Sequence, residues 1–314
     1  MNNYFELKIS INPNIEDIVS DICFSNFPSC EGVILAEEAW KDLEMTATTR
    51  GTLKVFLTTP HPVSDHLLPQ GAKGEYLLEI QSVLHKEREI LKSRGFSDED
   101  LGSWEISIDE KENQDWSKKW KEKWTVTHVT DKIAVVPSWL DYQPKENEVI
   151  ITLDPGCAFG TGTHQTTQLC MKAIEKYLEE GNSMADIGTG SGILAICAKK
   201  FGANEVYGCD NDETVIDVCI ENAGVNGVND IKFELNTADK LSEKYDFVCA
   251  NILHNVLAEI MGDLKNIMKP QAKLVLSGIL DEKKPVVLDA INKHGLKIID
   301  TLHQDQWVAF VVEN

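Results

Sequence analysis

Hydrophobic and polar residues follow two different patterns along the chain, one in each half. In the first half, apolar positions alternate over short runs or recur at helical spacing, as they do in strands and amphipathic helices. Their order is strand 4–11, helix 14–27, strand 31–38, strand 52–59, helix 75–95 and strand 103–109. This βαββαβ order predicts a small α+β domain of the ferredoxin-like type.

The second half contains short runs that are apolar throughout, which is typical of parallel strands buried on both faces of a sheet. We expect strands at 184–188, 205–210, 231–235, 245–253 and 273–280, and helices at 192–202, 213–225, 256–269 and 285–295. Two final strands, 296–302 and 307–314, are joined by the polar stretch HQDQ, which is a hairpin signal. The pattern predicts an α/β domain with a doubly wound, mostly parallel sheet and an antiparallel terminal hairpin.

Between the two halves lies the stretch NQDWSKKWKEKW, in which Trp116, Trp120 and Trp124 recur every four residues. That spacing places the three rings on one face of a helix, which we expect to connect the domains. The aromatic face is expected to pack against a domain, and a platform that contacts substrate is the alternative. The predicted organisation is a domain at 1–110, a linker helix with strands at 111–147, and a domain at 148–314.

Composition narrows the classes of function. The 314 residues carry 51 acidic and 30 basic side chains, a formal charge of −21. This charge disfavours a nucleic-acid-binding surface and suits a basic partner, although solubility alone explains it at least as well. No stretch is apolar over the length of a membrane span and the N-terminus lacks a signal-peptide pattern, so we expect a cytoplasmic protein without membrane contact. The eight cysteines include no C-x-x-C pair, and we expect buried, reduced thiols and no metal site.

Two glycine-rich segments lie close together, LDPGCAFGTGTHQTTQLC at 153–170 and MADIGTGSGILAICAKKFGA at 184–203. The glycine turn of the second segment follows the predicted strand at 184–188, and ligands of such folds bind beyond the carboxyl ends of the strands. Asp210 ends the next strand, where a carboxylate can accept hydrogen bonds from the hydroxyls of a ribose. The glycines are spaced G-x-G-x-G behind Asp186, and Ile193 stands where a dinucleotide-binding turn has its third glycine. No Gly-Lys-Ser/Thr follows them, which excludes a Walker phosphate loop.

The arrangement of Asp186 and its glycines resembles motif I of the S-adenosylmethionine-dependent methyltransferases. The stretches LDPGCAFGTGTHQTT, DIGTGSGILAI, GCDND and ANIL, in this order, look like the bacterial methyltransferase family of ribosomal protein L11, the PrmA type. The likeness covers the C-terminal half by motif, the linker by QDWSKKWKEKW and IAVVPSW, and the N-terminal part by the order of its elements. It implies a seven-stranded class I methyltransferase sheet, with S-adenosyl-L-methionine as the cofactor.

The resemblance also implies the residues of the site. Asn251 would be both the catalytic residue and a cofactor contact, because its side chain can orient the amine or the cofactor. The loop at 159–164 would fold over the cofactor, so that both glycine-rich segments serve one ligand. The other residues expected to bind the cofactor are Thr167, Gly188, Gly190, Asp210, Phe159 and Asp186.

Several residues near these motifs stay open to two interpretations. His164 is the best candidate for a general base, but a hydrogen bond that orders the loop is the favoured alternative. Thr166 and Thr167 begin a predicted helix and could each be only an N-cap. Asp239 could contact the adenine or be a turn residue. Gln165 stands where the family usually has proline, and we expect a looser loop with cofactor binding retained.

The implied activity is methylation of lysine side chains and of an N-terminal α-amine of ribosomal protein L11, free of the ribosome. Residues 1–110 would recognise that protein, and the linker would let this domain move. The alternative is a class I N-methyltransferase that acts on another protein or on a small amine. A binding protein that has lost catalysis is disfavoured by the retained motif residues, and a nicotinamide dehydrogenase is disfavoured by Ile193.

Overall fold

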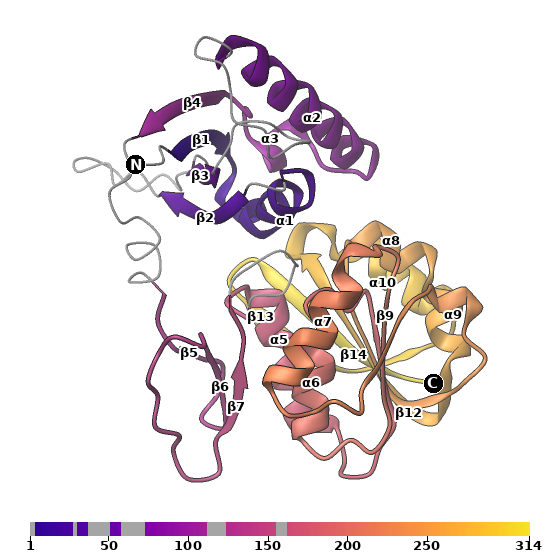
Figure 1. The fold of residues 1–314 in the computed structure, drawn as a ribbon. Helices are drawn as coiled ribbons and strands as arrows, with labels where there is room; N and C mark the ends of the chain where they lie inside the picture. Colours follow the sequence, from indigo (N-terminus) through magenta and orange to yellow (C-terminus); the bar gives the residue numbers. More distant parts are fainter. Residues whose placement is uncertain (1–3, 28–29, 37–50, 58–72, 112–123, 155–161) are drawn as a thin grey trace, which may run out of the picture. The chain divides into compact units, whose positions relative to one another are not determined.

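The computed structural model describes residues 4–27, 30–36, 51–57, 73–111, 124–154 and 162–314 (Figure 1). The chain separates into two compact units, Met1–Trp124 and Thr125–Asn314. The expected linker helix with Trp116 and Trp120 lies outside the described residues. The assignment of separate roles to 1–110, 111–147 and 148–314 stays a prediction.

The first unit contains one four-stranded antiparallel sheet with the strand order β2-β3-β1-β4. Each βαβ unit is split, since β3 lies between β1 and β2, and β1 lies between β3 and β4. The predicted βαββαβ order is confirmed, with the short helix α3 added before the last strand. The elements are β1 (Tyr4–Ile11), η1 (Pro13–Ile15), α1 (Glu16–Asn26), β2 (Cys30–Ala36), β3 (Gly51–Leu57), α2 (Lys73–Ser93), α3 (Asp98–Leu101) and β4 (Ile106–Lys111).

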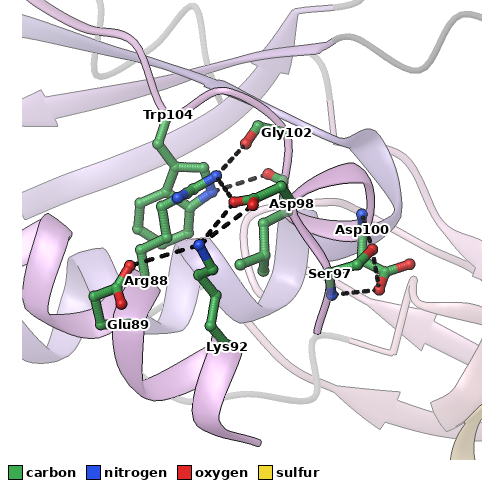
Figure 2. Close-up of polar contacts among 9 residues, drawn as sticks. Arg88, Glu89, Lys92, Ser97, Asp98, Asp100, Gly102 and Trp104 are labelled. Carbon is green, nitrogen blue, oxygen red and sulfur yellow. Dashed lines mark hydrogen bonds and ion pairs between the residues drawn. The ribbon is translucent and has the colours of Figure 1, made fainter. Parts of the chain in front are cut away.

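Polar contacts fix the path of the chain from α2 to β4 (Figure 2). Arg88 and Lys92, one helical turn apart, both form ion pairs with Asp98, at 2.7 and 3.0 Å. Nη2 of Arg88 also donates to the carbonyl oxygen of Gly102 at 3.0 Å. Trp104 has a φ of 52°, in the left-handed region that few residues other than glycine adopt. These contacts hold α3 against the end of α2 and start β4 along the edge of the sheet.

The second unit contains a three-stranded sheet, β5-β6-β7, and a seven-stranded sheet with the order β10-β9-β8-β11-β12-β14-β13. Strands β8 to β12 pair in parallel, and β14 pairs antiparallel with both β12 and β13. The predicted mostly parallel sheet with a terminal hairpin is confirmed. The strands are β5 (Thr127–His128), β6 (Ile133–Val136), β7 (Val149–Thr152), β8 (Met184–Ile187), β9 (Val206–Asp210), β10 (Lys232–Leu235), β11 (Tyr245–Asn251), β12 (Met268–Leu280), β13 (Lys297–Gln304) and β14 (Trp307–Glu313).

Helices cover both faces of the seven-stranded sheet. Alternate residues of each strand point to opposite faces, and each face packs against its own set of helices. Phe247 and Cys249 of β11 pack in one core cluster with helices α5 and α6, whereas Val248 and Ala250 pack in a second cluster with α8, α9 and α10. The helices are α5 (Gln165–Tyr177), α6 (Ile193–Lys200), α7 (Thr214–Val225), α8 (His254–Glu259), α9 (Met261–Asn266) and α10 (Lys284–Lys293), with the short turns η3 (Ala238–Lys240) and η4 (Asp281–Lys283).

The prediction of one helix at 256–269 is wrong. The segment forms two short helices that meet at Ile260, the C-cap of α8 and the N-cap of α9. Gly262 weakens helix formation just after this point, and a Cβ there would lie 3.0 Å from the ring of His294. Met268 already belongs to β12, because it pairs with Tyr245. Close packing of this segment against the end of α10 thus outweighs its apolar periodicity.

Burial of the cysteines is confirmed for six positions, Cys23, Cys170, Cys197, Cys209, Cys219 and Cys249. Burial raises the pKa of the Cys209 and Cys219 thiols to about 12, so neither forms a thiolate readily near neutral pH. Among the described residues, no helix is long and apolar enough to cross a membrane. The same residues hold no group of three or more His, Cys, Asp and Glu side chains that could bind a metal ion.

Candidate functional site

The candidate site lies at the carboxyl ends of three neighbouring strands, β9, β8 and β11. The chain runs outward from β8 to β9 and β10 and then returns to β11 on the other side of β8. Such a reversal of strand order opens a crevice in which doubly wound sheets bind their ligands. Gly188 follows β8, and Asp210 and Asn251 end β9 and β11. The structure therefore brings these three predicted residues to one edge of the sheet.

The turn after β8 exposes backbone where side chains cannot fit. Gly188, Gly190 and Gly192 have φ values of 73°, 52° and 79°, all in the left-handed region. A Cβ on Gly188 would overlap the side chain of Ile252, and a Cβ on Gly192 would lie 2.8 Å from Cβ of Cys219. Glycine is required for this backbone conformation and for these close approaches. The glycines at 188 and 192 thus let the side chains of Ile252 and Cys219 pack against the backbone of the turn.

Asp186 supports this turn from inside the core. Its side chain has no exposed surface, and its Oδ2 accepts a hydrogen bond from the hydroxyl of Thr189 at 2.8 Å. Burial raises the pKa of the Asp186 carboxyl to about 7, and the bond from Thr189 opposes the shift. The carboxyl orders the turn through Thr189.

Asp210 is held by the backbone on both of its carboxylate oxygens. Oδ2 accepts the N–H of Gly190 at 3.0 Å, and Oδ1 accepts the N–H of Asp212 at 3.1 Å. Burial raises the pKa of the Asp210 carboxyl above its ordinary value, and these backbone bonds oppose the rise. Each carboxylate oxygen has a second lone pair, so the group can accept further hydrogen bonds from two neighbouring hydroxyls.

Asn251 is joined to the first turn of α5. Its Nδ2 donates to Oγ1 of Thr167 at 3.3 Å, and both residues are buried. Its Oδ1 is also buried, and no donor among the described residues forms a hydrogen bond with it. A buried acceptor without a partner costs about 1–3 kcal/mol. The amide therefore presents an acceptor that a bound N–H group could satisfy.

The N-cap of α5 is His164, so the interpretation of Thr166 or Thr167 as the N-cap is wrong. Nδ1 of His164 accepts the N–H of Thr166 at 3.3 Å and lies 2.7 Å from Oγ1 of the same residue. The imidazole also packs edge-on against the ring of Trp307, with 4.8 Å between centroids. This geometry favours a role in ordering the chain over a role as general base. Gln165 donates to Oδ2 of Asp305 at 3.4 Å.

The two glycine-rich segments meet in space. A Cβ on Gly162, from the first segment, would lie 2.9 Å from Cδ1 of Ile193, which directly follows the glycines of the second. Ile193 thus fills space that the third glycine of a dinucleotide-binding turn would leave open. Phe159 lies outside the described residues. Asp239 is exposed, in η3 after β10.

Sequence reasoning missed two residues that contact this region, Ser277 and Trp307. Ser277 lies fully buried in β12, and its hydroxyl donates to the carbonyl oxygen of Thr166 at 3.0 Å. One signal was available for it, a single hydroxyl residue inside the apolar run LVLSGIL. Trp307 had no comparable signal, because an aromatic residue at the start of a buried strand is common.

Comparison with known proteins agrees with this geometry. The family model described as "Ribosomal protein L11 methyltransferase (PrmA)" matches residues 3–314. A protein of that name from Caldicellulosiruptor bescii is 40% identical over 213 residues, which cover 68% of this chain and 69% of the relative. Another from Exiguobacterium is 36% identical over 245 residues, which cover 77% of each chain.

One solved structure supports the same assignment. The crystal structure of a ribosomal protein L11 methylase from Lactobacillus delbrueckii subsp. bulgaricus aligns with a TM-score of 0.58 and 34% sequence identity. The alignment covers 61% of this chain and 99% of that structure. The methyltransferase fold is therefore common to both chains.

Proposed function

This chain belongs to the ribosomal protein L11 methyltransferase (PrmA) family, and from that membership we propose that it methylates amino groups of ribosomal protein L11. S-adenosyl-L-methionine is the cofactor, and lysine side chains and an N-terminal α-amine are the acceptors. The observation that carries the proposal is the meeting of Gly188, Asp210 and Asn251 at adjoining strand ends, in a chain whose family match spans 3–314.

The residues at the strand ends fit this cofactor. We propose that the main chain of the turn at Gly188 and Gly190, whose φ values of 73° and 52° lie in the left-handed region, lines the methionine part of the cofactor. Asp210 has lone pairs left for the two hydroxyls of the ribose. Thr167 and Asn251 lie at the side of the crevice that adjoins β11. The roles of Phe159 as a cofactor contact and of Asp186 as more than a support of the turn stay predictions from the family resemblance.

Methyl transfer needs a neutral, oriented amine. The bound sulfonium supplies an activated methyl group for displacement by nitrogen. A lysine amine with a pKa of about 10.4 must first lose its proton, which costs roughly 4–5 kcal/mol at pH 7. We propose that Oδ1 of Asn251, which is buried without a donor among the described residues, accepts an N–H of the neutral amine and so directs the nitrogen lone pair toward the methyl group. His164 is engaged as an N-cap, and we assign it no proton transfer.

The first unit offers a place for a protein substrate. Strand β4 pairs only with β1 among the described strands, so its outer edge has backbone groups that an extended segment could pair with. A groove beside it is lined by residues of α2, including His85 and Arg88, and by Trp104 and Glu105. We assign recognition of L11 to residues 1–110.

Charge and composition bear on the partner. With 51 acidic against 30 basic residues, the surface repels the phosphates of RNA, so we propose that L11 is methylated free of the ribosome without direct nucleic-acid contact. A negatively charged enzyme also attracts a lysine-rich substrate. We place the enzyme in the cytoplasm, where that substrate is synthesised.

The direct test is the intact mass of unmethylated L11 after incubation with the enzyme and S-adenosylmethionine. We expect mass gains in steps of one methyl group, and no gain with Asp210→Ala. A matched control is Asp300→Ala, which removes a carboxylate of β13 that pairs with Lys176 at the C-terminal end of α5. If L11 gains no mass while the cofactor binds, the substrate is another protein or a small amine.

A further inference from the structure

Two neighbouring strands hold consecutive residues of α5. Asn251 of β11 and Ser277 of β12 are partners in the parallel ladder. Asn251 donates to the side chain of Thr167 at 3.3 Å, and Ser277 donates to the main-chain carbonyl of Thr166 at 3.0 Å. The first turn of α5 is therefore fixed to the sheet at two adjacent points, and one of them is the amide at the candidate catalytic position.

A β-bulge aims Ser277 at this helix. Between Leu276 and Ile279 strand β12 advances three residues while β14 advances two, so one extra residue is inserted in β12. Gly278, inside the bulge, has a φ of 84°, and a Cβ on it would overlap the backbone of Ile252. Bulges of this kind redirect side chains next to functional sites. The bulge also lets the backbone of Ile252, the residue after the end of β11, lie close to Gly278 of β12.

The hydroxyl of Ser277 is not needed to satisfy the carbonyl that it binds. Thr166 is the second residue of α5, so its carbonyl oxygen already accepts the N–H four residues later in the helix. The hydroxyl is itself completely buried, where alanine would avoid the cost of burying a polar group. What the bond adds is the position of the first turn of α5 relative to β12.

We infer that Ser277 is a positioning residue for methyl transfer, and this inference rests on the function proposed above. By fixing the backbone at Thr166, Ser277 fixes the hydroxyl of Thr167, and that hydroxyl fixes the amide of Asn251. The amide then keeps Oδ1 turned toward the acceptor amine. We expect the glycine turn and Asp210 to contribute more to cofactor binding than Thr167 and Asn251 do, and Ser277 forms no hydrogen bond to the turn or to Asp210 in the described structure.

Ser277→Ala separates this role from a structural one. Its matched control is Ser183→Ala, which removes another buried serine hydroxyl. That hydroxyl binds Asp246 of β11 and Lys269 of β12, near the ends of these strands that lie opposite the candidate site. We expect the single-turnover rate of L11 methylation to fall about tenfold in Ser277→Ala, with the Kd for S-adenosylmethionine changed less than threefold. Ser183→Ala should keep the wild-type rate even if its melting temperature falls as much as that of Ser277→Ala.

A second readout does not depend on activity. The side-chain amide signal of Asn251, assigned by its loss in Asn251→Asp, is expected to shift or broaden in Ser277→Ala and to stay unchanged in Ser183→Ala. A rate within twofold of wild type, equal losses in the two variants, or an unchanged amide signal would overturn the inference. If the wild-type enzyme does not methylate L11, the proposed function fails by itself, and the amide signal still decides the role of Ser277.

Discussion

Nδ2 of Asn251 lies 3.3 Å from Oγ1 of Thr167, and this contact joins the carboxyl end of β11 to the first turn of α5. Eighty-four positions separate the two residues in the sequence. The amide nitrogen donates one hydrogen bond to Thr167, whereas the amide oxygen has no donor among the described residues and can accept one from a ligand. The contact thus brings the first glycine-rich segment, which contains Thr167, to the end of β11.

Asn251→Ala removes the unpaired acceptor. We expect the single-turnover rate of methyl transfer to fall about 10- to 100-fold, because the amine loses the group that orients it. Thr167→Val keeps the shape of the side chain and removes the hydroxyl, and it should reduce the rate less. The exposed Asn292 of α10 provides the control, since Asn292→Ala should leave the rate unchanged. Equal rates for Asn251→Ala and Asn292→Ala would contradict the role of Asn251.

Gly188→Ala tests the close approach of the backbone after β8. The substituted residue keeps the unfavourable φ of 73° and adds a Cβ that overlaps the side chain of Ile252. We expect at least tenfold weaker binding of S-adenosylmethionine in calorimetry. Gly227→Ala is the matched control, because Gly227 has a φ of 70° and no heavy atom would lie within 4 Å of a Cβ added there. That control should lose about 1 kcal/mol of stability through strain and keep its cofactor affinity.

Asp186→Asn tests the raised pKa of the buried carboxyl. Since the folded-state pKa is about 7 against a model-peptide value of 3.8, the folded protein keeps a proton that the unfolded chain releases. The contribution of Asp186 to stability is therefore complete below about pH 4 and is lost as the pH rises to about 7. As the pH rises from about 4 to about 7, the free energy of unfolding of the variant should increase relative to that of wild type, by up to about 4 kcal/mol. A constant difference between pH 4 and pH 8 would show that Asp186 titrates normally.

Glu313 should behave in the opposite way. Hydrogen bonds from Lys273 and Lys297 lower the pKa of its carboxyl to about 2. The stabilisation is present above the ordinary value of 4.5 and is lost as the pH falls toward 2. Urea unfolding should show wild type more stable than Glu313→Gln at pH 6, with a smaller difference at pH 3. High salt should also reduce the difference, because the three side chains are partly exposed. A difference that is the same at both pH values would contradict this account.

The parts of the fold that follow local rules were predictable. The runs that became β8, β9, β11 and β12 are apolar because both faces of the sheet are covered there, and the pattern that predicts them depends only on that burial. The helix at 256–269 was not predictable in the same way. Its interruption at Ile260 depends on the approach of Gly262 to His294, which are distant in the sequence.

The candidate site also has residues that local motifs predict and residues whose roles depend on contacts distant in the sequence. Gly188, Asp210 and Asn251 follow strands in a motif order that the sequence displays. The sequence left Thr166 and Thr167 open as possible N-caps of α5 and did not indicate His164, because histidine is not a preferred N-cap. The packing of His164 against Trp307 favours the observed cap, and that contact links residues in α5 and β14. Ser277 had one local signal, its hydroxyl inside an apolar run, but its partner Thr166 lies 111 positions away and could not be identified from the sequence.

The most direct test of the central claim is a calorimetric titration of S-adenosylmethionine into wild-type enzyme and Asp210→Ala near neutral pH. The claim is that the ends of β8, β9 and β11 form one cofactor site. Hydrogen bonds to a charged group contribute about 1.5–3 kcal/mol each, so the loss of this carboxylate should weaken binding at least tenfold. Wild type should bind one equivalent, and Asp300→Ala should match it. Equal affinity of Asp210→Ala and wild type, with both proteins folded, would contradict the assignment of the site.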